Sequence, residues 1–480
     1  MRVRLLILGL VVAAAIGAAA AQGAATIAIF TIAGGDVGGF KGDGRPATSA
    51  SLNGPAGVLA AGDGGILIAD TINQRVRRID PSGRILTIAG NGSRGFAGDG
   101  GPPTGATLQD PTALALGKDG SLYVADTGNN RIRVIRPNGV IGTVAGTSDQ
   151  GFSGDGGPAS AAQLNAPQGL AIALNGGVFL SDTGNNRVRL IRPDGTIATV
   201  AGSGKAGFAG DGAPATGAEL NAPSGLAVAG DGALLIADTG NNRVRRVGGD
   251  GKITTVAGDG GGGSAGDGGD ATSAQLNSPV DVATVPAGGF FVAEAGGNRI
   301  RHVDPAGHIA RLAGTGGPRF GGDGRAASTA LLNAPRAVEL MPSGVEVLVA
   351  DTDNDRVRYI AIPGQASRLA LAPLKDTVTA PLVKKAVTVK KRKRRILVVK
   401  DVPITFRVTK DSRLMVQITP KKGKGASRLI TRIAAGAGAI HLPPMSRSGT
   451  RRLKKGHYVV RMTVTAGLES ASKTLELIVK

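Results

Sequence analysis

The 480-residue chain contains no cysteine and no tryptophan. The absence of cysteine excludes disulfide bonds and thiolate metal sites, and it also excludes a lipid anchor attached to cysteine. Only four histidines are present, and aromatic residues make up 3% of the chain. This scarcity argues against a zinc centre built from several histidines and against a sugar-binding surface built from stacked rings.

The amino-terminal sequence predicts export from the cell. Residues 1–4 are short and basic, residues 5–20 are apolar, and Ala19, Ala20 and Ala21 are small residues that precede Gln22. This order is typical of a secretory signal peptide, which we assign to residues 1–21. An uncleaved membrane anchor is the alternative, although the apolar run is short for the ~20 residues that a span requires. We therefore expect a secreted, extracellular protein, with association to the cell wall as a further option.

The positive charge of the chain is concentrated at one end. The whole chain has a net charge of +21, but residues 364–480 alone hold 27 Lys and Arg against five Asp and Glu. The first 363 residues hold 29 basic and 30 acidic side chains, so they are close to neutral. The basic character therefore belongs to a separate C-terminal region.

The 78 glycines recur at fixed positions, because the chain repeats itself six times. A Gly-Asp-Gly motif and a proline both return every 56 residues; the prolines are Pro55, Pro111, Pro167, Pro223, Pro279 and Pro335. A third motif, Asp-Thr-x-Asn-x-Arg-Val/Ile-Arg, begins at Asp70, Asp126, Asp182, Asp238 and Asp351, and a degenerate copy begins at Glu294. Repeats of this length predict one supersecondary unit per copy.

Each copy contains four short segments of strand-forming residues. In the second copy these are residues 112–116, 121–126, 131–136 and 140–145, separated by turns rich in Asp, Asn and Gly. Such turns supply the positive φ angles of tight hairpins, so each copy predicts a four-stranded meander. Meanders bury their faces by stacking on neighbouring copies, and six copies arranged radially form an all-β, six-bladed β-propeller.

The two ends of the repeat region complement each other. The sixth copy stops after its third strand, near residues 357–362, and the missing Thr-Val-Ala-Gly strand has its counterpart in residues 29–34. We therefore predict that the N-terminal strand completes the last blade and closes the ring. Closure removes the two exposed sheet edges that would otherwise favour aggregation.

These repeats resemble the NHL-repeat family, in the long bacterial form with the insert Gly-Phe-x-Gly-Asp-Gly. The second copy carries this insert at residues 95–102, and the resemblance covers residues 26–363. It implies a six-bladed propeller. It does not imply one activity, because NHL propellers include binding modules, sensor domains and a few lyases.

The repeated acidic residues are candidates for two roles, and they are Asp70, Asp126, Asp182, Asp238, Glu294 and Asp351. We favour a structural role, in which each carboxylate caps a turn and pairs with an arginine such as Arg131. The alternative is an acidic ring that holds a cation. The fifth copy differs from the others, since it has Ser264 in place of phenylalanine and holds both propeller histidines, His302 and His308.

The C-terminal region is predicted as a basic linker, residues 364–395, followed by a small immunoglobulin-like β-sandwich, residues 396–480. Seven strand-like segments support the sandwich, the first of them residues 396–399. The linker ends in a basic run that would contact an anionic polymer or membrane surface outside the cell. Its residues are Lys390, Lys391, Arg392, Lys393, Arg394 and Arg395.

We favour a binding protein over an enzyme. The propeller would bind a protein or a small ligand, and the basic region would contact the anionic cell surface. No nucleophile and base pair stands out, no cofactor is expected, no metal ligands are assigned, and nucleic acid is not an expected partner. A monomer is expected. The alternative is a metal-dependent lyase or lactonase in the propeller channel, and a third option is a structural spacer without a ligand pocket.

Overall fold

The computed structural model describes residues 27–35 and 37–362 together with six strands between residues 402 and 479. The chain divides into two compact units, residues 1–364 and 365–480. The predicted signal peptide, the basic run at residues 390–395 and the predicted strand at residues 396–399 lie outside the described residues. Among the described residues, helices are too short or too polar to cross a membrane.

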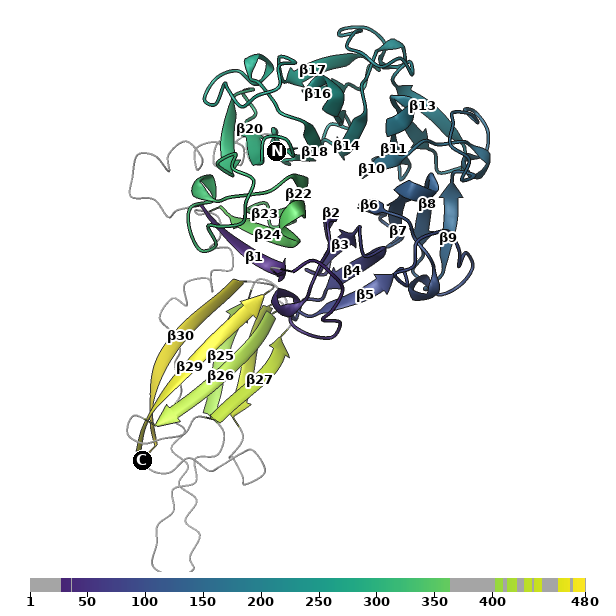
Figure 1. Cartoon of the computed structure of the whole chain (residues 1–480). Coiled ribbons are helices and arrows are strands. Elements are labelled where there is room, and N and C mark those ends of the chain that lie inside the picture. The colour runs from purple at the N-terminus through teal and green to yellow at the C-terminus, as the bar shows by residue number, and fades with distance from the viewer. Residues whose placement is uncertain are drawn as a thin grey trace, which may run out of the picture. The chain divides into compact units, whose positions relative to one another are not determined.

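The first unit is a ring of six four-stranded antiparallel sheets (Figure 1). In each sheet, or blade, the strand that begins at the repeated proline lies innermost. Blades one to three comprise β2 (Pro55–Ala60), β3 (Ile66–Asp70), β4 (Arg75–Ile79), β5 (Ile85–Ala89); β6 (Pro111–Leu116), β7 (Leu122–Asp126), β8 (Arg131–Ile135), β9 (Ile141–Ala145); and β10 (Pro167–Ile172), β11 (Val178–Asp182), β12 (Arg187–Ile191), β13 (Ile197–Ala201). Blades four to six comprise β14 (Pro223–Val228), β15 (Leu234–Asp238), β16 (Arg243–Val247), β17 (Ile253–Ala257); β18 (Pro279–Thr284), β19 (Phe290–Glu294), β20 (Arg299–Val303), β21 (Ile309–Ala313); and β22 (Pro335–Leu340), β23 (Glu346–Asp351), β24 (Arg356–Ala361), β1 (Ala28–Gly34).

The N-terminal strand closes the ring, as predicted. Strand β1 pairs antiparallel with β24, with Ile29 opposite Ile360 and Phe30 opposite Tyr359. The inner strands also contact one another in a complete cycle, from β2 through β6, β10, β14, β18 and β22 back to β2. The last blade is therefore assembled from both ends of the repeat region (Figure 1).

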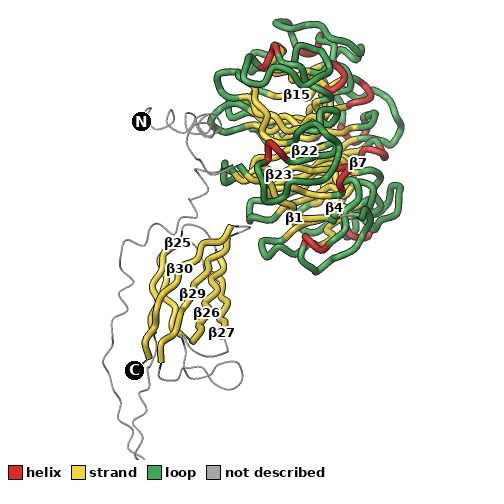
Figure 2. Tube along the Cα trace, turned by 60° about the vertical axis from the view of Figure 1, so that its left-hand side comes forward, coloured by secondary structure: helices red, strands yellow, loops and turns green. Residues whose placement is uncertain are grey.

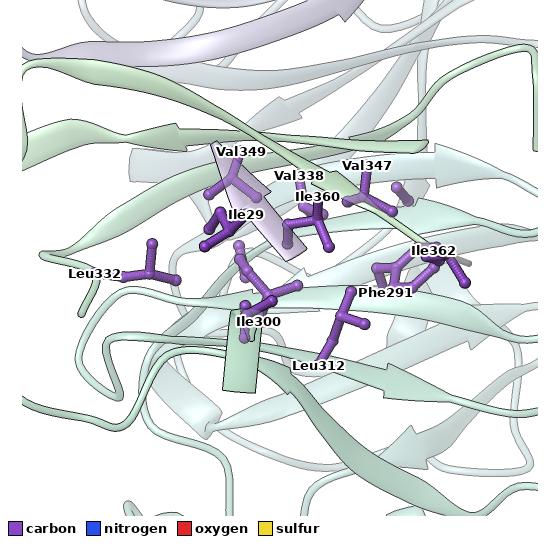
Figure 3. Close-up of a cluster of buried hydrophobic side chains, with 14 of the residues drawn as sticks. Ile29, Phe291, Ile300, Leu312, Leu332, Val338, Val347, Val349, Ile360 and Ile362 are labelled. Atoms are coloured by element: carbon purple, nitrogen blue, oxygen red, sulfur yellow. The ribbon is translucent and has the colours of Figure 1, made fainter. Parts of the chain in front are cut away.

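The hydrophobic core is divided among the six interfaces between neighbouring blades. Each cluster of buried side chains draws on two adjacent blades, because the pleated faces of a single meander cannot be buried by that meander alone. Figure 3 shows the cluster between blades five and six, where Ile29 of the closing strand lies among Ile300, Val349 and Ile360. The closing strand thus belongs to the core as well as to the sheet.

Within residues 27–35 and 37–362, helical structure is confined to single 3-10 turns in the connections (Figure 2). Six occur in the long inserts that precede the inner strands: η1 (Ala47–Ser49), η2 (Pro103–Gly105), η4 (Ala159–Ala161), η6 (Ala215–Gly217), η8 (Ala271–Ser273) and η9 (Ala327–Thr329). Four follow the second strands: η3 (Thr127–Asn129), η5 (Thr183–Asn185), η7 (Thr239–Asn241) and η10 (Thr352–Asn354). Asn130, which ends η3, has a left-handed φ of 51°, a conformation that asparagine tolerates better than most residues.

The second unit contains two antiparallel sheets. One pairs β25 (Val402–Val408) with β28 (Gly436–Leu442), and the other has the order β27-β26-β29-β30. The bounds of these four strands are β26 (Ser412–Pro420), β27 (Ser427–Ile433), β29 (Gly456–Ala466) and β30 (Glu469–Val479). The immunoglobulin-like sandwich stays a prediction.

Candidate functional site

The repeated acidic residue of each blade lies at the end of the second strand and is fully buried. In blade two, Asp126 accepts hydrogen bonds from the Gln109 main-chain N–H at 2.7 Å and from the Asn129 amide at 2.8 Å. Its third partner is the guanidinium of Arg133, at 3.2 Å. Arg133 also binds the Gly-Asp-Gly residue Asp99 at 2.6 Å, so it ties the long insert to the blade.

The predicted pairing with Arg131 was wrong in its choice of arginine. Arg131 lies opposite Asp126 in the ladder, but its guanidinium donates to the carbonyl oxygens of Gly146 and Thr147. It also stacks on the ring of Phe96, with 3.8 Å between the guanidinium carbon and the ring centroid. These loop groups hold Arg131 at the surface, and the buried carboxylate is left to the next arginine on the same face of the strand.

The same arrangement recurs around the ring. The six bridging arginines are completely buried: Arg77, Arg133, Arg189, Arg245, Arg301 and Arg358. Each repeated acidic residue is therefore engaged by an arginine and by main-chain or amide donors. Both acidic positions of the repeat, the second-strand residue and the Gly-Asp-Gly residue, are occupied by the fold and are not free to hold a cation.

The fifth blade compensates for its altered motif. Glu294 pairs with Arg301 at 3.4 Å. Gly297 stands where the other blades have asparagine, and a Cβ on it would lie 2.6 Å from a Glu294 oxygen. The longer glutamate side chain therefore occupies the space that asparagine fills in the other blades. Burial raises the pKa of Glu294 to about 7. His302 is buried against Phe291, and burial lowers the pKa of this histidine to about 4. His302 is therefore a neutral packing residue.

The hollow of the propeller is an axial channel of about 550 Å³, lined by the six inner strands. It has a long-loop end, where the inner strands begin at the repeated prolines, and a short-turn end, where they finish. Small and aliphatic residues dominate its wall. A volume of this size falls within the range of small-molecule sites in proteins.

Two inner-strand positions break the six-fold pattern of the wall. Two residues after the repeated proline, five blades have glycine or alanine, whereas blade five has Asp281. Four residues after it, five blades have leucine or alanine, whereas blade six has Glu339. Both side chains line the channel and are partly exposed. The sixfold symmetry of the channel wall is therefore interrupted by one acidic pair on adjacent blades.

The position of Asp281 is set by its two neighbouring blades. One carboxylate oxygen accepts the main-chain N–H of Val338 at 2.9 Å, a donor on the inner strand of blade six. On the other side, Gly225 provides the space, since a Cβ there would lie 2.2 Å from the second carboxylate oxygen. Hydrogen bonding and close packing together hold this carboxyl group at one place.

Glu339 has no hydrogen-bond or ion-pair partner among the residues that the structure describes. Burial, and to a smaller extent the nearby charge of Asp281, raise the pKa of Glu339 to about 8. Burial also raises the pKa of Asp281 to about 7, against the effect of its main-chain hydrogen bonds from Val338 and Val282. Arg336, at the long-loop end, is the other charged residue of the channel wall. The pair therefore titrates near neutral pH as a coupled unit.

The sequence expectation for the channel was incomplete. The repeated motifs drew attention to the second-strand acidic residues, and they did not single out Asp281 and Glu339 on the inner strands. The signal lay in the 56-residue register, because comparing the same position in all six copies isolates one aspartate and one glutamate. No three His, Asp or Glu side chains gather into a metal-binding group anywhere in the part of the chain that the structure describes.

Comparison with known proteins identifies the repeat. The family model described as NHL repeat matches residues 108–135 and 220–247, which span the first three strands of blades two and four. The propeller is an NHL-repeat propeller. The chain is also similar in sequence to Teneurin-1 of Mus musculus, with 32% identity over 232 residues, which is 43% of this chain and 8% of that protein. The chain thus spans less than a tenth of the length of this relative.

Two solved structures share the fold of the NHL propeller. One is a structural genomics protein of unknown function from Bacteroides thetaiotaomicron, with a TM-score of 0.52 and 16% identity over 70% of this chain and 75% of that one. The other is an auxiliary nutrient binding protein from the same organism, with a TM-score of 0.51 and 14% identity over 70% and 76%. At these identities the likeness concerns the fold alone.

Proposed function

We propose that this protein is an extracellular binding protein whose NHL propeller takes a small ligand in its axial channel. The observation that carries the proposal is the acidic pair of Asp281 and Glu339. Residues that only build a blade recur in every blade, as the buried arginines do, whereas these two occur once each and face the hollow. The name of the nutrient-binding protein with the same fold is consistent with this use of a propeller.

Binding in the channel is tested with a chemically mixed set of small molecules, using thermal shift and then calorimetry on the full chain. Leu116→Trp adds a large side chain to the channel wall at the short-turn end, where Leu116 is half-buried. Leu174→Trp is the control, since Leu174 is 59% exposed and does not line the channel. A ligand that binds the wild type and Leu174→Trp but not Leu116→Trp supports the proposal. Equal binding by all three proteins contradicts it.

The second part of the proposal concerns the basic C-terminal region. Residues 390–395 would contact an anionic polymer at the cell surface through charge attraction, which salt weakens. Isolated cell walls should retain the full chain at low salt and release it as the salt concentration rises. Changing the six basic residues of this run to glutamine should abolish retention. Retention of that variant, or retention that salt does not affect, would refute this part.

A metal-dependent lyase or lactonase remains the second candidate, because the channel does contain two carboxyl groups. The described residues do not fit it well, since no third ligand-type side chain joins Asp281 and Glu339. Elemental analysis of the purified protein decides the point. One divalent ion per chain, lost in Asp281→Asn, would favour this candidate over a binding protein.

A further inference from the structure

The acidic pair points to the chemistry of the ligand. We propose that Asp281 and Glu339 bind the ammonium group of a small aliphatic amine, whose carbon chain lies against the apolar wall of the channel. This inference rests on the proposed function, because it assumes that the channel is a ligand site.

The first argument is that the acidic pair lowers the stability of the folded propeller. The five other blades place glycine, alanine or leucine at the same positions and still form the same ring. Two neighbouring carboxyl groups in a narrow channel repel each other when charged and lose hydration. Asp281 accepts hydrogen bonds only from the main chain, from Val338 and Val282, and Glu339 has no partner among the described residues. Beyond the inter-blade hydrogen bond from Val338, the two charges add nothing to the ring that glycine, alanine or leucine would not provide.

The second argument is the match between donors and acceptors. An ammonium group carries one positive charge and three N–H donors. Asp281 offers a carboxylate that the main-chain N–H groups of Val338 and Val282 hold in place, and Glu339 offers a carboxyl group without a partner among the described residues. An ammonium between them would compensate the negative charge and satisfy these oxygens, as charge-assisted hydrogen bonds do.

The third argument is the composition of the wall around the pair. Four of the six side chains toward the short-turn end are Leu116, Ile172, Val228 and Leu340, which are half-buried and apolar. The other two are Ala60 and Thr284, and the Thr284 hydroxyl donates to the Val228 carbonyl oxygen at 3.2 Å. The four apolar side chains suit the carbon chain of an amine and offer no ligand to a metal ion, which would need six or more oxygens if it were calcium. Arg336 is three residues from Glu339 on the same strand, about 10 Å along it, and lies toward the long-loop end. Its charge favours an amine that places its ammonium beside the acidic pair and its chain toward the short-turn end.

The test is isothermal titration calorimetry on the full chain at pH 8, with n-butylamine and 1,4-diaminobutane as probes. Butanol and butyrate are the neutral and anionic analogues, and calcium chloride is the metal probe. We expect both amines to bind, and butanol, butyrate and calcium to bind at least tenfold more weakly. Binding should release protons, so the measured heat should differ between buffers of different ionisation enthalpy.

Variants separate the amine site from the channel. Asp281→Asn and Glu339→Gln should each weaken amine binding at least tenfold. Glu219→Gln, which removes a carboxylate paired with Lys205 on the outside of blade four, should bind the amine as the wild type does. Equal amine binding by wild type and Glu339→Gln would overturn the proposal. So would tighter binding of calcium or butyrate than of the amines.

The amine proposal and the proposed function can fail separately. If a neutral or anionic molecule binds the wild type and is lost in Leu116→Trp, the channel is a ligand site and the amine proposal is wrong. If no molecule distinguishes Leu116→Trp from Leu174→Trp, the proposed function is wrong as well.

Discussion

The main-chain N–H of Val338 donates a 2.9 Å hydrogen bond to the carboxylate of Asp281, and this bond joins blade six to blade five. The inner strand of a blade has no ladder partner on its channel side, so its N–H groups need other acceptors. Asp281 meets this need at one point in the ring. It thereby fixes a carboxyl group in the hollow, next to Glu339, where each other blade has a small or aliphatic side chain.

The acidic pair should make stability depend on pH. Carboxyl groups in the unfolded chain titrate near pH 4, whereas the pKa values of Asp281 and Glu339 in the fold are about 7 and about 8. A raised pKa means that the folded state prefers the protonated form, so stability is retained below about pH 4 and is lost as the pH rises towards 8. Glu339→Gln should therefore be more stable than the wild type at pH 8, by roughly 2 kcal/mol after screening by channel water, and similar to it at pH 4.

Thermal unfolding of the wild type and of Glu339→Gln between pH 4 and pH 8 checks whether the variant is the more stable protein at pH 8. Glu219→Gln is the control, because its carboxylate lies outside the channel and should give no gain at pH 8. A Glu339→Gln protein that is less stable than the wild type at pH 8 would show that Glu339 has a stabilising partner.

The buried arginines should be far more important for stability than their exposed neighbours. Arg245 binds Asp238 and Asp211 and is completely buried, whereas Arg246, the next residue, pairs with Asp231 on the surface. Arg245→Met should lower the free energy of unfolding by about 3–5 kcal/mol, since it leaves a buried carboxylate without its counter-charge. Arg246→Met should lower it by less than about 1 kcal/mol. Urea unfolding measures both, and equal losses would contradict the structural role of the bridge.

The closing strand offers a matched pair on adjacent residues. Ile29 is fully buried between blades five and six, while Phe30 is 42% exposed. Ile29→Ala should lower the free energy of unfolding by about 2–4 kcal/mol, because it leaves a cavity at the closure of the ring. Phe30→Ala should cost about 1 kcal/mol or less. If both changes had the same small effect in chemical unfolding, the closing strand would not belong to the cooperative core.

Gly225 tests how closely the inner strands approach each other. A Cβ at this position would lie 2.2 Å from an Asp281 oxygen and 2.7 Å from the Val280 carbonyl oxygen, so Gly225→Ala must push blades four and five apart. We expect a loss of about 1–3 kcal/mol in urea unfolding. Gly230→Ala is the control, because nothing lies within 4 Å of a Cβ there, and it should change stability by less than about 0.5 kcal/mol. Equal behaviour of the two variants would contradict the close packing around Asp281.

The periodicity of the sequence made the architecture predictable, but it did not predict which side chains pair with each other. A fixed interval of 56 residues gave the six blades, the strands of each blade and the closure by residues 29–34, because these depend on local sequence and on the count of strands. The choice between Arg131 and Arg133 as partner of Asp126 could not be made, since both lie on the same strand. In the structure, a loop carbonyl oxygen and the Phe96 ring bind the guanidinium of Arg131, which leaves Arg133 to pair with Asp126.

The sequence by itself determined the ring and its signature residues, because hydrophobic alternation and turn residues act over a few positions and were repeated six times. It also contained Asp281 and Glu339, but it gave no reason to consider them together, as 57 residues separate Asp281 from the Val338 that binds it. Only closure of the propeller brought the inner strands of blades five and six side by side around a hollow. The enclosed space then removed water from the two carboxyl groups and coupled their charges, which is a property of the assembled ring and of neither blade alone.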